Sequence, residues 1–522
     1  MQIRCPSLQL SNHHLPHRYD LANRRQPHWR LKAQAETPAI PIKKRKTTKL
    51  YIRRTDGNSC SALRHCFCFE RRNKLNMFSS LNMFVARGNW ADASHMTDLT
   101  RRKLLASSAS VMAGAALAST SNANAQGAIP QVTAGTSPRP APAIIQGLPD
   151  VLVVGGGAFG AWSALSLLEK GAKVKLVDAY GVGNARQTSG DETRQIRAAY
   201  GEDEVYSRWA MRAYDLWHQR QDEFGRGMIY DNGVLSANEP EDKLAVEMDI
   251  FNRLGIPYEV IPHDELVRRW PQGRWDDVEY ALYEPKAGTV KARESLIAVS
   301  ENFQAKGGEV DMAHVMPGAM SGGTMASAVM SNGEDITAGS YLFACGPWIG
   351  DVFPDILAGY IRLRRSEVYY VGSPAGDTRY TYREFPNMWE PHAGAYAMSD
   401  IDYGYKVVPR FGIGIDPTDD DRVPSSFLML KVYDYLRQRL PGLVDQPIVA
   451  SRVCALEISN NHHYIIDQHP EASNVWIAGG GSGHAFKMGP MLGEYISDRM
   501  LSLADDPELR DLYAIATHAP HA

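Results

Sequence analysis

Three glycines, Gly155, Gly157 and Gly160, have the G-x-G-x-x-G spacing of a loop that can hold a phosphate group. A glycine-rich turn before a helix exposes backbone N–H groups and the positive end of the helix dipole, and both attract phosphate oxygens. Asp178 follows at the distance where a carboxylate can accept hydrogen bonds from a ribose. The pattern predicts a dinucleotide site.

The segments around these glycines fit a βαβ unit. Asp150–Val154 predicts a short strand, the leucines up to Gly171 predict a helix, and Lys173–Val177 predicts a second strand. In such a unit the first glycine makes the tight turn, the second admits the pyrophosphate, and the third lets the helix and strand pack closely. A glycine-rich turn in another parallel sheet is the alternative, but the two strands and the acidic end favour the dinucleotide site.

Charge divides the chain into unlike parts. Residues 1–95 contain 18 Lys and Arg against 5 Asp and Glu and show no apolar periodicity, so we expect a non-folded or mis-assigned extension. Residues 126–522 contain 35 Lys and Arg against 53 Asp and Glu, a balance that argues against a nucleic-acid partner. Four of the six cysteines lie in residues 1–95, and the separation of the other two favours neither a disulfide framework nor a metal site.

A segment that starts at Met96 resembles a twin-arginine export signal. Arg101-Arg102 precedes an Ala-rich apolar stretch, which leads to the small-x-small motif Ala123-Asn124-Ala125 that signal peptidase accepts. A membrane span needs about 20 strongly apolar residues, and this stretch is shorter and rich in Ala and Ser. We therefore predict no stable membrane span, a periplasmic or secreted protein, a signal peptide over residues 96–125 and a linker over residues 126–149.

Three further segments resemble, in order and spacing, the monomeric sarcosine oxidase and N-methyltryptophan oxidase family of the D-amino-acid oxidase superfamily. They are the polar block at residues 189–201, the strand and Cys-Gly-Pro-Trp turn at residues 340–348, and the strand and glycine loop at residues 474–487. With the βαβ unit, the resemblance extends from about Asp150 to about Leu501. It implies FAD as the cofactor, whereas the glycine fingerprint alone leaves FAD and NAD open.

The resemblance implies an α/β fold with two domains in an α+β arrangement. One is a glutathione-reductase-like FAD-binding Rossmann domain, made of residues 150–235, 288–358 and 447–515. The other is a discontinuous substrate domain with an antiparallel sheet, made of residues 236–287 and 359–446. The sequence itself adds strand-like runs at Val368–Gly372 and Tyr405–Val408.

The resemblance also implies roles for basic residues. Arg194 and Arg197 match arginines near the flavin face, and in the family the second of them grips the substrate carboxylate. A guanidinium suits this task because its planar fork holds a carboxylate through two hydrogen bonds. Lys487 matches a lysine that helps to bind the same carboxylate, and His484 matches another family position. An exposed arginine pair, a solvent-facing lysine and a structural histidine are the alternatives.

Two more matches concern the flavin ring directly. Lys406 matches the family lysine on the side of the flavin where oxygen reacts, and a lysine at a strand edge is the alternative. Cys454 matches a cysteine that forms a thioether to the flavin 8α carbon, and a free buried cysteine is the alternative. The glycines that match turns on the nucleotide side and beneath the ring are Gly346, Gly481 and Gly483.

These matches imply an FAD-dependent oxidoreductase that oxidises the C–N bond of a small secondary amine or amino acid to an imine, while oxygen is reduced to hydrogen peroxide. A periplasmic amino-acid dehydrogenase with a quinone or another electron acceptor is an alternative, and so is a flavin-binding subunit without turnover. Arg410 stands where sarcosine-using members place a histidine, which argues against sarcosine itself and favours a larger or more acidic derivative. We expect a monomer.

Overall fold

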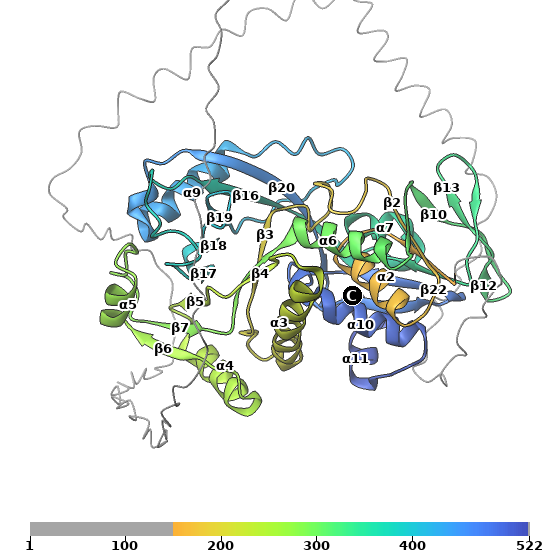
Figure 1. Ribbon diagram of the computed structural model, residues 1–522, viewed down its shortest axis with the longest axis horizontal. Coiled ribbons are helices and arrows are strands. Elements are labelled where there is room, and N and C mark those ends of the chain that lie inside the picture. The colour runs from red at the N-terminus through yellow and green to blue at the C-terminus, as the bar shows by residue number, and fades with distance from the viewer. Residues whose placement is uncertain (1–149, 520–522) are drawn as a thin grey trace, which may run out of the picture. The chain divides into compact units, whose positions relative to one another are not determined.

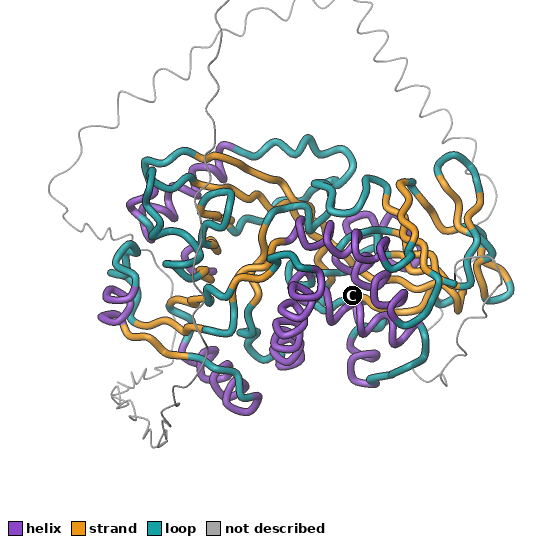
Figure 2. Tube along the Cα trace, in the orientation of Figure 1, coloured by secondary structure: helices purple, strands orange, loops and turns teal. Residues whose placement is uncertain are grey.

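The computed structural model describes residues 150–519 (Figure 1). The predicted extension, signal peptide and linker, over residues 1–149, lie outside the described residues. Within the described part, two large sheets and the helices around them position the candidate site residues. Figure 2 shows these strands in orange and the helices in purple.

The first sheet has six strands in the order β21-β22-β15-β1-β2-β9, and all neighbours are parallel except β21 and β22. The parallel pairing of β1 with β2 confirms the predicted βαβ unit. All four residues of β1 are buried, as expected for a parallel strand covered on both faces. The strands are β1 (Val151–Val154), β2 (Val174–Asp178), β9 (Glu309–Met312), β15 (Ser340–Phe343), β21 (Ile465–His469) and β22 (Ala472–Gly479).

Helix α2 (Ala158–Glu169) is apolar on nearly all sides because it packs against the six-stranded sheet and against two other helices, α6 (Ala292–Ala305) and α10 (Gly489–Met500). Two glycines of α10 let it approach α2 closely. A Cβ atom at Gly489 would lie 2.4 Å from Nε1 of Trp162, and one at Gly493 would lie 2.5 Å from the Trp162 carbonyl oxygen. The start and the end of the described chain are thereby joined.

The second sheet has eight strands in the order β20-β16-β19-β18-β17-β5-β7-β6, and all neighbours are antiparallel except β17 and β5. It contains the strand-like runs expected from the sequence: β16 includes the first run as far as Val371, so that Gly372 lies just beyond the strand, and β19 includes the second run. β20 lies in this sheet although its residues follow the predicted limit of the substrate domain; the domain limits themselves stay a prediction. The strands are β5 (Val234–Ala237), β6 (Glu259–Pro262), β7 (Tyr280–Glu284), β16 (Ile361–Val371), β17 (Asn387–Glu390), β18 (Ala395–Met398), β19 (Tyr405–Pro409) and β20 (Ile448–Ser459).

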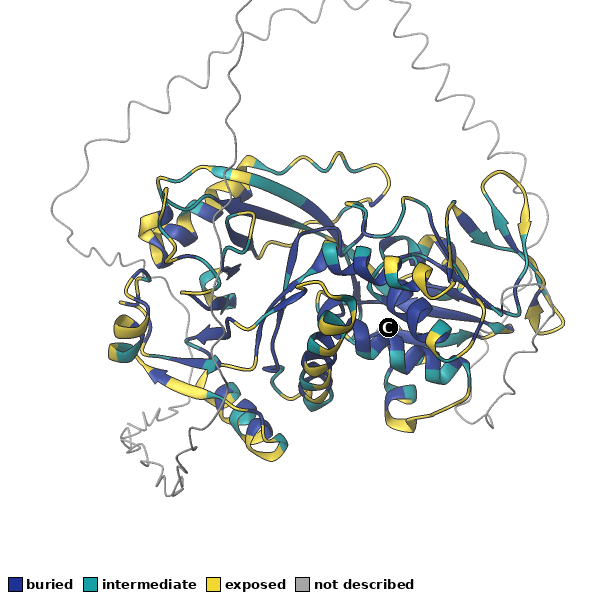
Figure 3. Ribbon diagram, viewed as in Figure 1, coloured by how far each residue is buried: buried dark blue, intermediate teal, exposed yellow. Residues whose placement is uncertain are grey.

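Smaller elements connect the two sheets. A three-stranded antiparallel sheet carries the polar block of residues 189–201, and its strands are, in order, β3 (Thr193–Ile196), β8 (Gly288–Lys291) and β4 (Ile229–Tyr230). The outward faces of α4 (Glu241–Leu254) and α5 (His263–Arg269) are exposed, whereas the large sheets are mostly buried (Figure 3). Among the described residues, the helices are too short or too polar to cross a membrane.

The remaining helices are α3 (Glu204–Phe224), α7 (Ile349–Val352), α8 (Pro354–Leu357), α9 (Ser426–Arg439) and α11 (Pro507–Leu512). The remaining strands are β10 (Val315–Pro317), β11 (Met320–Ser321), β12 (Thr324–Met325), β13 (Ala328–Met330) and β14 (Asp335–Ile336).

Candidate functional site

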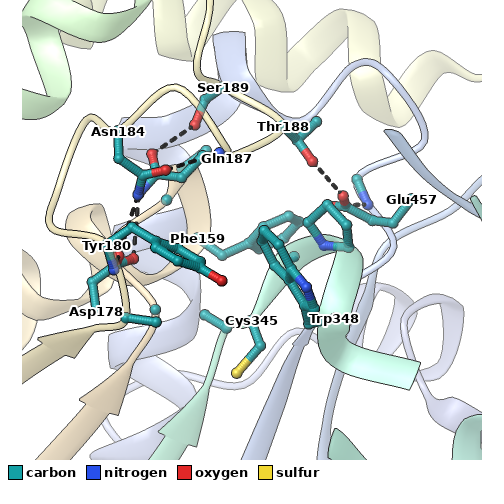
Figure 4. Close-up of a pocket in the computed structure, with 18 of the residues that line it drawn as sticks. Phe159, Asp178, Tyr180, Asn184, Gln187, Thr188, Ser189, Cys345, Trp348 and Glu457 are labelled. Atoms are coloured by element: carbon teal, nitrogen blue, oxygen red, sulfur yellow. Dashed lines mark hydrogen bonds between the residues drawn. The ribbon is translucent and has the colours of Figure 1, made fainter. Parts of the chain in front are cut away.

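A cavity of about 400 Å³ lies at the carboxyl ends of β1, β2 and β15. The rings of Tyr180 and Trp348, whose centres are 5.8 Å apart, form part of its wall together with Phe159 (Figure 4). The carboxyl end of a parallel sheet is where α/β folds bind their ligands. The predicted site residues that line the cavity are Gly155, Gly157, Asp178, Arg194, Gly346, Gly481, Gly483 and His484.

The glycine turn has the geometry of a phosphate cradle. Gly155 has a φ of +103°, and a Cβ there would lie 2.3 Å from the carbonyl oxygen of Ala344 in the neighbouring strand end. A Cβ at Gly157, the residue that precedes α2, would meet no atom within 4 Å, so this backbone faces open space in the cavity. A Cβ at Gly160 would lie 1.8 Å from the carbonyl oxygen of Gly155, so the close packing of turn and helix requires glycine.

Asp178 ties this turn to the end of β2. Its Oδ2 accepts a hydrogen bond from the Gly156 N–H at 2.7 Å, and its Oδ1 accepts one from the Tyr180 N–H at 2.8 Å. Asn184 and Gln187 also donate to this carboxylate (Figure 4). The carboxylate therefore holds the loop that surrounds the cavity, in addition to lining the cavity itself.

Glu457 closes the opposite side of the cavity and was not found from the sequence. Its Oε2 accepts a hydrogen bond from the Thr188 hydroxyl at 2.7 Å (Figure 4), and its Oε1 accepts one from the Gly481 N–H at 3.4 Å. Burial raises the pKa of this carboxyl group. The contacts join Thr188, in the loop after β2, to the glycine loop after β22, two segments far apart in the sequence.

Asp191 is the centre of a buried charge cluster. Its carboxylate accepts a hydrogen bond from Nζ of Lys406 at 2.5 Å, one from the Tyr370 hydroxyl at 2.6 Å, and a further one from the guanidinium of Arg194. The Asp191 side chain is 0% exposed and that of Lys406 is 1% exposed. Lys406 is therefore not a lysine at a strand edge with its ammonium in water. Burial lowers its pKa, although the charge of Asp191 opposes that change.

Both cysteines of the described part are free, and they differ in their surroundings. Cys454 is buried on β20, with its Sγ 4.0 Å from Nη2 of Arg194, and burial raises the pKa of its thiol. Cys345 lines the cavity (Figure 4), and burial raises the pKa of its thiol to about 12. The cysteine that was predicted to carry the cofactor thus lies beside Arg194, a residue of the cavity wall.

A second group of cations lies around two aromatic rings. Arg197 places its guanidinium carbon 4.1 Å from the ring centre of Trp389 and 5.3 Å from that of Tyr200. Lys487 donates a hydrogen bond to the Tyr200 hydroxyl at 2.9 Å. Within residues 150–519, neither cation forms an ion pair with a carboxylate, although both are at least nine-tenths buried. Burial and the charge of Arg197 hold the pKa of Lys487 well below its usual range.

Glu284 lies near these two cations. Its Oε2 accepts a hydrogen bond from the Ala198 N–H at 2.6 Å, and its Oε1 has no hydrogen-bond partner in the described part of the chain. Burial raises the pKa of this carboxyl group to about 7, even though Arg197 and Lys487 both act to lower it. Glu284 is therefore only partly ionised near pH 7, and it compensates the charge of Arg197 incompletely.

His484 lines the cavity, and both of its ring nitrogens are engaged. Nδ1 lies 2.9 Å from the Tyr464 hydroxyl, and Nε2 lies 3.0 Å from the carbonyl oxygen of His462. A carbonyl can only accept, so Nε2 carries the proton and Nδ1 accepts from the tyrosine. Burial lowers the pKa of His484 to about 3, so the ring is neutral and held in one tautomer.

The structure thus gathers the predicted residues into three groups. The first lines the cavity, apart from Gly160, which packs behind the glycine turn. In the second, Lys406 and Arg194 share Asp191, and Arg194 connects this group to the cavity wall and to Cys454. In the third, Arg197 and Lys487 share Tyr200. Sequence reasoning missed the residues that join each group. One signal was present for Asp191, a carboxylate three residues before Arg194 in a block already singled out. Nothing local marked Glu457, Trp389 or Glu284.

Comparison with known proteins gives one family and several relatives. A family model described as FAD dependent oxidoreductase matches residues 150–499. The chain is 27% identical to a monomeric sarcosine oxidase of Bacillus sp. over 368 residues, which is 68% of this chain and 92% of that protein. It is 23% identical to an N-methyl-L-tryptophan oxidase of Salmonella enteritidis, over 67% of this chain and 94% of that protein.

Among solved structures, an L-proline dehydrogenase from P. horikoshii has the same fold. It superposes with a TM-score of 0.63 at 20% sequence identity, over 70% of this chain and 97% of that one. The family match over residues 150–499 includes both large sheets and every site residue described above. The chain therefore belongs to the family of FAD-dependent oxidoreductases.

Proposed function

We propose that this enzyme oxidises the C–N bond of a secondary amine that carries a carboxylate, an N-substituted amino acid, to an imine that water hydrolyses, with oxygen as the electron acceptor and hydrogen peroxide as the product. The observation that carries the proposal is the pair Arg197 and Lys487. Two buried cations on one tyrosine ring, without a carboxylate partner in the described part, suit the carboxylate of an amino acid. Sarcosine and N-methyl-L-tryptophan, named in the relatives, are both N-methyl amino acids.

The cavity fits FAD by its own chemistry. The open backbone at Gly157 and the N-terminus of α2 would hold the pyrophosphate, and the Asp178 carboxylate lies at the end of β2 for the ribose. Tyr180 and Trp348 provide aromatic walls. When bound, FAD supplies an acceptor for the two electrons that leave the substrate.

The chain's own residues would bind and orient the substrate and would place a positive charge where oxygen reacts. Arg197 and Lys487 would fix its carboxylate, and this fixes the position of the adjacent carbon. The depressed pKa of Lys487 makes its ammonium easy to deprotonate until a substrate carboxylate restores the charge. Lys406, held by Asp191 and by the carbonyl oxygen of Thr193 at 2.5 Å, would provide a fixed positive charge for the reaction with oxygen.

One observation favours a second candidate, a dehydrogenase that passes electrons to a quinone or another carrier. The carboxylate of Asp191 compensates the ammonium of Lys406 at 2.5 Å, which weakens the field available to stabilise superoxide. The two candidates differ in the acceptor and share the substrate site.

Turnover of a substrate panel separates them. Purified holoenzyme is given N-methyl amino acids, free amino acids and amines without a carboxylate, with peroxide release and dye reduction measured side by side. We expect peroxide, and we expect activity only with substrates that carry a carboxylate. Dye reduction without peroxide would support the dehydrogenase, and equal rates with amines that lack a carboxylate would contradict the proposed substrate class.

We also propose that FAD is attached covalently through Cys454. Its thiol lies next to Arg194, and the spacing resembles that of the flavinylated cysteine in the sarcosine oxidase family. We expect the yellow colour to remain in the pellet after acid precipitation of the wild-type protein, and to be released from the Cys454→Ala variant. Cys345→Ala is the matched control, because that thiol lines the cavity but is not predicted to react. Loss of colour from the wild type would show that the cofactor is bound without a covalent link.

We further propose that the protein is exported by the twin-arginine pathway and acts in the periplasm or outside the cell. The support is the Arg101-Arg102 pair and the Ala123-Asn124-Ala125 motif. We expect the mature protein to begin at or near Gln126, which N-terminal sequencing of the exported protein measures. Residues from before Met96 on a functional exported precursor would contradict the predicted start.

A further inference from the structure

Three cations and two aromatic rings alternate in one row of side chains, here called the cation–aromatic row. Its members, in order, are Lys487, Tyr200, Arg197, Trp389 and Arg410. The ammonium of Lys487 lies 4.9 Å from the ring centre of Tyr200, and the guanidinium of Arg197 contacts both rings. The guanidinium carbon of Arg410 lies 5.3 Å from the ring centre of Trp389. The inner end of the row is buried, and the outer end, at Arg410, is exposed.

The strands of the second sheet fix the outer end. Trp389 lies on β17 and pairs with Tyr396 of β18, while Arg410 directly follows β19 on the other side of β18. The Arg410 N–H donates a hydrogen bond to the Gly394 carbonyl oxygen at 2.7 Å, which anchors its backbone. The side chain of Arg410 therefore reaches across β18 to the Trp389 ring from a rigid position.

Arg410 lacks the kind of counter-ion that Arg365 of β16 has, since Arg365 pairs with Glu367 at 2.8 Å. Arg364, also on β16, likewise forms no ion pair in the described part of the chain. In the part of the chain that the structure describes, the Arg410 guanidinium forms neither a hydrogen bond nor an ion pair. Its guanidinium is partly desolvated although the residue as a whole is exposed, and this lowers its pKa, as do the neighbouring charges of Arg364 and Arg197. The fold thus keeps like charges together at the outer end of the row.

The acidic groups nearby do not compensate this charge. The negative charge of Glu239 acts to raise the pKa of Arg410, but this carboxylate forms an ion pair with Lys243 at 2.7 Å. The Glu247 carboxylate lies 3.5 Å from the ammonium of the same lysine. The raised pKa of Glu284, about 7, keeps a large fraction of that group neutral. An anionic group of a ligand would therefore find two guanidinium groups without a carboxylate partner in the described part of the chain, Arg197 within the row and Arg410 at its outer end.

We propose that the outer end of the row is a second anion subsite, in which Arg410 on the face of Trp389 holds a second carboxylate of the substrate. The inference rests on the proposed function, in which Arg197 and Lys487 hold the first carboxylate. A guanidinium that lies over a ring keeps its N–H edge free for two hydrogen bonds to a carboxylate. The substrate class is then an N-substituted amino dicarboxylic acid, whose two anionic groups span the row.

Binding of acids that cannot be oxidised tests this subsite. The holoenzyme is titrated with succinate, glutarate and adipate, and with butyrate, pentanoate and hexanoate as monoacids of equal length, while the flavin absorbance is followed. For the best-fitting length we expect the diacid to bind at least about tenfold more tightly than its monoacid, as one charge-assisted pair provides. Arg410→Gln should reduce this ratio to below about twofold and leave monoacid affinity unchanged.

Arg383→Gln is the matched control, because Arg383 is also exposed and also lies over an aromatic ring, 5.0 Å from the centre of Tyr382, outside the row. It should keep the wild-type ratio. Equal binding of diacids and monoacids by the wild type, or an unchanged ratio in Arg410→Gln, would overturn the second subsite alone. A wild type that binds neither kind of acid would overturn the carboxylate site of the proposed function as well.

Discussion

Replacing Lys406 with methionine is expected to slow reoxidation of the reduced cofactor by oxygen about a hundredfold, while anaerobic reduction by the substrate stays largely intact. The first electron passed to oxygen creates superoxide, an anion, in a poorly solvated space. A fixed ammonium stabilises that charge without reorganisation, and Lys406 is fixed by Asp191 and by the Thr193 carbonyl oxygen. Stopped-flow absorbance measures the two half-reactions separately.

A lysine elsewhere provides the control for this variant. Lys170 is also paired with an aspartate, Asp498 at 2.7 Å, but it lies on the far end of α2 from the cavity, so Lys170→Met should change neither half-reaction. Equal slowing of both half-reactions in Lys406→Met would indicate a damaged site. Unchanged reoxidation would instead support the dehydrogenase, in which oxygen is not the natural acceptor.

The Asp191→Asn variant is expected to lose about 3–5 kcal/mol of the free energy of unfolding, the cost of leaving buried charges without their partner. Asp191 faces both Lys406 and Arg194, and its own side chain is 0% exposed. Asp311→Asn is the matched control, because it removes a carboxylate 2.6 Å from Lys175 that is 57% exposed. That loss should stay within about 1 kcal/mol. Urea unfolding of the holoenzymes measures both.

The same variant has a predictable dependence on pH. Burial alone would raise the pKa of Asp191, but the charges of Lys406 and Arg194 outweigh burial and lower it. The folded-state pKa therefore lies below the unfolded-state value of about 3.9. The stabilisation by the ionised carboxylate is fully present above that value and is lost as the pH falls through the folded-state pKa. The stability difference between wild type and Asp191→Asn should shrink as the pH falls below about 5, and a difference that persists in acid would contradict this account. Because the charge of Asp191 also supports the protonated form of the buried Lys406, the difference should narrow again in alkaline solution, where Lys406 of the variant loses its proton more readily.

The parts of the site that the sequence predicted are those with local signals. Gly155, Gly157 and Gly160 lie in the turn after β1 and the first residues of α2, and β2 follows directly. Their spacing can therefore be recognised within one short segment of the sequence. The pairing of Lys406 with Asp191 joins residues 215 positions apart, and no local pattern encodes it. Glu457 pairs with Leu363 of β16 and Trp389 with Ser236 of β5, and the register of both long-range pairings depends on the whole second sheet. Resemblance located Lys406 without revealing that a carboxylate compensates its charge.

The contact between α2 and α10 has a consequence for the timing of synthesis. The hydroxyl groups of Ser166 and Ser497 meet at 2.8 Å across this contact, although 331 residues separate them in the chain. At about 5–20 residues per second, the ribosome needs on the order of half a minute to deliver the second helix after the first. Until then α10 cannot pack on α2, and Trp162 and the apolar residues around it stay exposed to solvent. A nascent chain is thus expected to need a chaperone during this interval and to capture its cofactor only after translation has passed α10.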